Sequence, residues 1–105
     1  MDADELLGKM IDAGRGLAGT IWSQMETVAI PELRKIAIEI AELAKPGNPW
    51  SEEESKILLR MQVRSAVTII VAMTALTMLA VQNAINAILD AVREFVNGKL
   101  PFPLL

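Results

Sequence analysis

The chain has 105 residues, of which 52% are hydrophobic and only 4% aromatic, and its formal net charge is −3. A chain of this length forms one domain, and a core of aliphatic residues with few rings favours closely packed helices. Acidic and basic residues are interleaved without a basic stripe, so nucleic acid is not an expected partner. The sequence contains no histidine and no cysteine, which removes the commonest general base, the thiolate nucleophile and the usual transition-metal ligands. We therefore predict no enzymatic activity, no metal and no cofactor.

The first helix is expected from about residue 5 to residue 44, with Asp4 capping its start. Apolar residues recur three and four apart on both sides of Pro31, so we predict one helix that continues through the proline with a kink. Four glycines weaken the first part of this helix, each by up to about 1 kcal/mol relative to alanine. These glycines require tertiary support or a close backbone approach, and they are Gly8, Gly14, Gly16 and Gly19.

A loop with two prolines and a glycine, Lys45–Trp50, ends the first helix. Ser51 and Glu54 have the spacing of a capping box, which begins a second helix over about residues 52–97. Gly98 is expected to end that helix in the left-handed conformation. Because the loop is short, we predict a single all-α domain over residues 1–105. It is a long antiparallel helical hairpin that assembles into a four-helix or larger bundle, and residues 98–105 form a non-helical apolar tail.

The middle of the second helix carries no charged residue from Ser65 to Leu89. A polar line along its last third, from Asn83 to Asn97, becomes apolar when it is traced back towards the N-terminus. A hairpin partner covers only one stripe of a helix, so a second surface must cover this one. We predict self-association through this face and through a neighbouring line of small residues, which allows close helix approach. The predicted residues are Ile69, Ala72, Leu76, Leu79, Ala80, Ala84, Ala87 and Ala91.

The same uncharged stretch, residues 65–89, is long enough to be one membrane span. Three threonines dilute its hydrophobicity, and no tryptophan or tyrosine flanks it at the expected interfaces. In a water-exposed bundle, the hydroxyls of Thr68, Thr74 and Thr77 are expected to bond to carbonyls one turn back. We favour a cytoplasmic, non-enzymatic scaffolding or interaction protein that forms homo-oligomers. The alternative is a small holin-like or pore-forming protein that inserts into the inner membrane.

Three further features bear on partners. A carrier of an apolar ligand is the least favoured function, because the expected core offers no polar anchor.

The tail contains Pro101 and Pro103, so it cannot extend the helix. It docks on this chain or a neighbouring subunit, or stays exposed for a second protein to bind. Methionines at helical spacing are expected mainly in the core, with an adaptable binding groove as the alternative; they are Met10, Met25, Met61, Met73 and Met78.

Overall fold

The structure, a computed structural model, describes residues 1–17 and 19–105. In these residues every regular element is an α-helix, which confirms the predicted all-α fold. The prediction of two long continuous helices is wrong, because each of them is divided into two. The four helices are α1 (Ala3–Leu17), α2 (Gly19–Leu43), α3 (Glu52–Met73) and α4 (Met78–Asn97).

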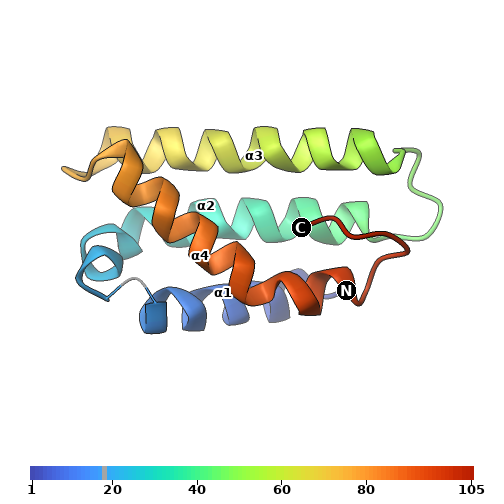
Figure 1. The fold of residues 1–105 in the computed structure, drawn as a ribbon, viewed down its shortest axis with the longest axis horizontal. Helices are drawn as coiled ribbons and strands as arrows, with labels where there is room; N and C mark the ends of the chain where they lie inside the picture. Colours follow the sequence, from blue (N-terminus) through green and yellow to red (C-terminus); the bar gives the residue numbers. More distant parts are fainter. Residues whose placement is uncertain (18) are drawn as a thin grey trace.

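The helices form two layers (Figure 1). Helices α1, α2 and α3 run antiparallel in sequence along one layer, and α4 crosses diagonally over it. Helix α2 is the central element and contacts each of the other three, whereas α4 packs mainly against α1. One chain therefore supplies all four helices of a bundle, and a bundle of this size does not require a second hairpin.

The first division lies between α1 and α2. Helix α1 ends at Leu17 and α2 begins at Gly19, whose φ of +50° belongs to the left-handed region that favours glycine. Position 18 lies outside the described residues. Helix α2 continues through Pro31, as predicted, and the kink at this proline stays a prediction. The start of α1 is capped by Asp2 and not by Asp4, because the Asp2 carboxylate accepts a hydrogen bond from the Asp4 N–H at 2.9 Å.

Helices α1 and α2 approach each other closely at Gly14. This glycine is buried, and a β-carbon placed on it would lie 2.5 Å from the ring of Trp22 in α2. The Trp22 side chain is itself buried in the core. The predicted close approach therefore applies to Gly14, whereas a β-carbon at Gly8 or Gly16 would meet no atom within 4 Å.

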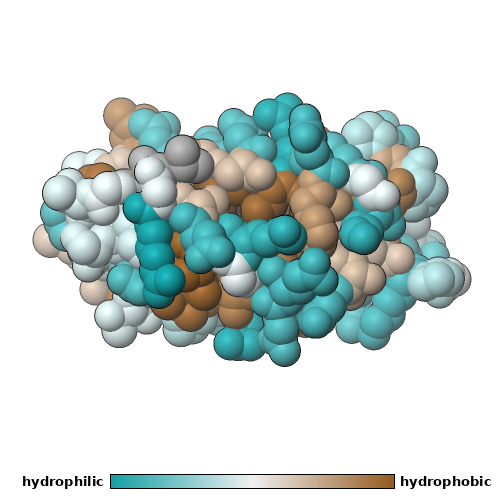
Figure 2. All heavy atoms as spheres, turned by 90° about the horizontal axis from the view of Figure 1, so that it is seen from below, coloured by the Kyte–Doolittle hydropathy of each residue, from teal (hydrophilic) through white to brown (hydrophobic). Residues whose placement is uncertain are grey.

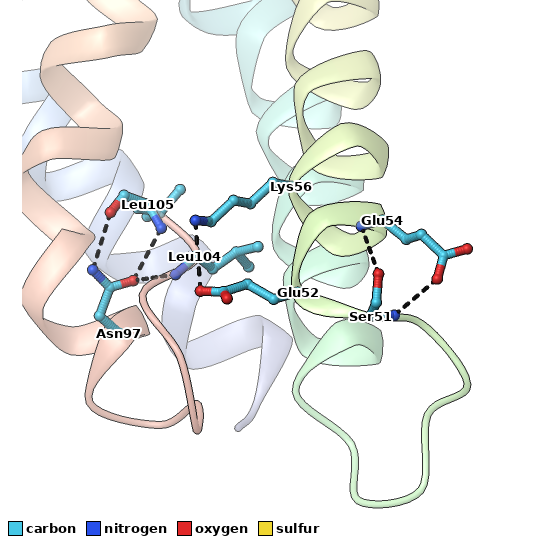
Figure 3. Close-up of polar contacts among 7 residues, drawn as sticks. All are labelled: Ser51, Glu52, Glu54, Lys56, Asn97, Leu104 and Leu105. Carbon is cyan, nitrogen blue, oxygen red and sulfur yellow. Dashed lines mark hydrogen bonds and ion pairs between the residues drawn. The ribbon is translucent and has the colours of Figure 1, made fainter.

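The connection between α2 and α3 has the predicted caps. Ser51 Oγ accepts a hydrogen bond from the Glu54 N–H, and the Glu54 carboxylate accepts one from the Ser51 N–H, both at 3.1 Å (Figure 3). Asn48 Nδ2 donates to the Leu43 carbonyl at 2.6 Å, which satisfies one of the free carbonyls at the end of α2. These contacts fix the sharp reversal that makes α2 and α3 antiparallel neighbours.

Replacement of Ser51 by alanine removes the acceptor for the Glu54 N–H and is expected to lower the free energy of unfolding by about 1 kcal/mol. The control is Ser65→Ala, at an exposed position inside α3, where the expected change is within about 0.5 kcal/mol. Urea denaturation followed by circular dichroism measures both. Equal stability of Ser51→Ala and the wild-type protein would show that the capping box does not stabilise α3.

The second division lies between α3 and α4, at a turn of four residues, Thr74–Thr77. Thr74 caps the end of α3, and its hydroxyl donates to the Ile70 carbonyl at 2.7 Å. The Thr68 hydroxyl likewise donates to a carbonyl one turn back, at 3.0 Å, so two of the three predicted threonine bonds are present. Thr77 instead caps α4, where its hydroxyl accepts from the Ala80 N–H at 3.2 Å.

The α3–α4 turn contradicts the predicted membrane span, and the end of α4 differs from the predicted cap at Gly98. Among the described residues, no helix is long and apolar enough to cross a membrane. The single span considered over residues 65–89 is wrong, because α3 supplies its first part and α4 its second. Gly98 does end α4, but its φ of −69° is right-handed and not left-handed as predicted.

Candidate interaction surface

The predicted self-association residues do not lie on one helix, because the turn at Thr74–Thr77 divides the predicted helix into α3 and α4. Ile69 and Ala72 lie on α3, Leu76 lies in the turn, and the other five lie on α4. Of these, Leu79 is the most outward-facing large residue, with 68% of its surface exposed, whereas Ala84 is buried in the core. The structure thus brings Leu79 to the surface and places part of the small-residue line inside the bundle.

Large apolar side chains are exposed around the α3–α4 turn. Met73, which ends α3, is 68% exposed, and Met78, which begins α4, is 53% exposed. Together with Leu79 they form the turn cluster. The described part of α1 contributes no large exposed hydrophobic residue. Seen from the side of α1, the surface is largely hydrophilic, with hydrophobic residues showing in small areas (Figure 2).

The turn cluster continues onto the outer face of α3. Met61, Ser65, Ile69 and Met73 recur four residues apart, which places them along one side of the helix, and they form the α3 outer stripe. Met61 is 63% exposed and Ile69 is half-buried, with a shallow hollow between them. The prediction that methionines mainly fill the core holds for Met10 and Met25 and is wrong for Met61, Met73 and Met78.

A groove separates α3 from α4 on another side of α3. Its more buried residues are Val63 and Val67, and its exposed rim carries basic and amide side chains. The volume of this α3–α4 groove is about 470 Å³. The residues that line it are Arg60, Val63, Arg64, Val67, Thr68, Met78, Gln82 and Asn86. The groove thus combines an apolar floor with a polar rim.

The two arginines of the groove differ from the other basic residues of the chain. Arg60 and Arg64 are one helical turn apart and, within the described residues, make no ion pair. Lys9 and Lys99 lie over the ring of Phe95. The remaining basic side chains pair with carboxylates, in the pairs Arg15–Glu26, Arg34–Asp4, Lys35–Glu32, Lys45–Glu42, Lys56–Glu52 and Arg93–Asp90. Among the residues that the structure describes, the positive charge of the groove thus has no carboxylate partner.

The C-terminal tail lies beside the end of α4, near the start of α3 (Figure 3). Asn97 Oδ1 accepts hydrogen bonds from the Leu104 and Leu105 N–H groups at 2.9 and 3.0 Å, and Asn97 Nδ2 donates to the Leu105 backbone oxygen at 3.1 Å. The Leu104 side chain is buried. The tail therefore docks on its own chain, one of the two arrangements predicted, and its recognition by a second protein stays a prediction.

The hollow lined by the tail adjoins the α3–α4 groove. Pro103, Leu104 and Leu105 line a second hollow of about 450 Å³, and Arg60 and Val63 line both this hollow and the groove. The chain's own apolar peptide thus occupies one end of a longer channel along α3. The part between Arg60 and Met78 is open.

Among the described residues there is no group of three or more acidic side chains placed to hold a metal ion. Comparison of the chain with protein-family models, with curated proteins and with solved structures gives no match. The surfaces themselves are therefore the basis for a functional proposal.

Proposed function

We propose that this chain is a non-enzymatic, cytoplasmic interaction or scaffolding protein whose bundle self-associates through the turn cluster and the α3 outer stripe. The observation that carries the proposal is the exposure of Met73, Met78 and Leu79, which flank the α3–α4 turn in the sequence. Burial of such side chains against a second copy removes apolar surface from water at about 25 cal/mol per Å². Methionine adapts its shape to a partner, which suits an interface of this composition.

The area of the contact favours a symmetric dimer. A stable interface buries roughly 800 Å² on each partner, which is more than three side chains supply. The α3 outer stripe extends the apolar surface along α3 from Met73 back to Met61. Two antiparallel copies of α3 would bring this stripe against itself, as a two-fold interface requires. The shallow hollow between Met61 and Ile69 provides space for a side chain of the second copy.

Self-association is tested by sedimentation velocity in detergent-free buffer with the variant Leu79→Lys. Leu79 is mostly exposed, so the lysine should leave the fold intact while it places a charge in the interface. We expect the wild-type protein to form dimers and the variant to raise the dimer dissociation constant by about tenfold or more.

The matched control is Ile38→Lys, which replaces a 47% exposed isoleucine of α2 outside the proposed interface. This variant is expected to dimerise as the wild-type protein does. A wild-type protein that remains monomeric at all accessible concentrations, or equal weakening by the two lysines, would contradict the proposal.

A further inference from the structure

We propose that the α3–α4 groove binds an acidic amphipathic helix of a different protein. The groove lies beside the α3 outer stripe and shares Met78 with the turn cluster, but binding of a partner in it does not require self-association. Its features that select a partner are two unpaired arginines, an apolar floor and an amide-bearing wall.

The charge of the groove indicates an acidic partner. Arg60 and Arg64 are separated by one helical turn, so their guanidinium groups can meet two carboxylates that are also one turn apart on a facing helix. A guanidinium pairs with a carboxylate through two parallel hydrogen bonds, which gives both energy and orientation. Gln82 and Asn86 line the opposite wall at the same one-turn spacing and offer further donors and acceptors.

The shape of the groove indicates a helix. The open part runs along α3 from Arg60 to Thr68 and along α4 from Met78 to Asn86, which is about 12 Å, or two helical turns. Val63 and Val67, one turn apart on its floor, match the spacing of apolar residues on one face of a helix. In Figure 1, α4 is the one helix that covers the layer of α1, α2 and α3, so an added helix would lie beside it in the second layer.

The Met78 side chain makes the groove adaptable at its end near the turn, where it is exposed. At the other end the docked tail lines the second hollow, which shares Arg60 and Val63 with the groove. A flat anionic surface would reach the arginines but not the recessed valines. The combination of both contacts therefore selects an amphipathic helix.

The experiment uses a labelled synthetic peptide of about 18 residues, long enough to populate a helix in water. Leucines spaced three and four apart form one face, and glutamates one turn apart flank it. A second peptide has lysines in place of the glutamates. Fluorescence anisotropy with the full chain is expected to show saturable binding of the acidic peptide, about tenfold or more tighter than that of the lysine peptide.

The variant with both Arg60→Gln and Arg64→Gln is expected to lose this preference. The matched control changes the same net charge with Arg15→Gln and Arg93→Gln, at exposed arginines that pair elsewhere, and should bind as the wild type does. Methyl resonances of Val63 and Val67 should shift on titration of the wild-type protein. Circular dichroism establishes that both double variants are folded.

Three results would overturn the assignment. They are the absence of saturable binding, equal affinity for the two peptides, and unchanged binding by the Arg60/Arg64 double variant. Because Met78 belongs to both the groove and the turn cluster, dissociation of the self-associated protein by the acidic peptide agrees with the assignment. Failure of self-association alone, with peptide binding intact, would contradict the proposed function and leave the groove assignment standing.

Discussion

Ile36→Ala is expected to lower the free energy of unfolding by about 2–5 kcal/mol, the usual range for a large-to-small substitution in a packed core. Ile36 is fully buried in α2, a helix that contacts all three others. The substitution leaves a cavity at the centre of the bundle, which neighbouring side chains fill only in part. For a domain whose total stability is of the order of 5–15 kcal/mol, this is a large fraction.

The control is Ile38→Ala, the same substitution two residues along the same helix. Ile38 is 47% exposed, so little packing is lost, and the change is expected to be within about 0.5–1 kcal/mol. Both variants gain the same helix propensity, which cancels in the comparison. Guanidinium denaturation measures both. A similar loss of stability at the two positions would mean that Ile36 does not lie in the core.

Gly14→Ala is expected to lower the free energy of unfolding by about 1–3 kcal/mol, because the new methyl group would overlap the Trp22 ring. The overlapping atoms belong to the aromatic ring of a buried side chain, which cannot swing into solvent without opening the core. The shift in the tryptophan near-ultraviolet circular dichroism signal should accompany the loss. Thermal and chemical denaturation measure the stability.

Gly8→Ala, in the same helix, is expected to change the free energy of unfolding in the opposite direction. A β-carbon at Gly8 meets no atom within 4 Å, so the alanine should raise stability by up to about 1 kcal/mol through its higher helix propensity. A lower stability for Gly14→Ala and a higher stability for Gly8→Ala would distinguish the effect of close packing from that of helix propensity. A stabilised Gly14→Ala protein would show that the ring of Trp22 moves freely.

The groove of Arg60 and Arg64 was not predicted from the sequence. Both arginines lie on a helix that was expected, but the groove forms only because α4 crosses α3, and the arginines make no ion pair with any described residue. Residue spacing along one helix predicts neither how a second helix crosses it nor which charged residues of other helices lie nearby. Leu79 was predicted to face outward, whereas the exposure of Met73 and Met78 follows from the turn that lies between them.

The sequence by itself determined the helical class and the reversal between α2 and α3. Proline and glycine in Lys45–Trp50 cannot continue a helix, and the Ser51–Glu54 box acts over three residues, so these are local effects that a pattern displays. The sequence likewise determined that an apolar surface would lie near residues 69–79, because the uncharged stretch exceeds what one neighbouring helix covers.

Only the tertiary structure decided that there are four helices and not two. The turn Thr74–Thr77 contains neither glycine nor proline, and its intrinsic preference against helix amounts to less than about 1 kcal/mol per residue. Folding α4 back buries Val81, Ile85 and Ile88, each of which gains about 1.5–3 kcal/mol when it leaves water. The free energy gained from these distant contacts exceeds the cost of interrupting the helix at four residues. Because such contacts join residues far apart in the chain, the helical periodicity of residues 52–97 did not reveal the break.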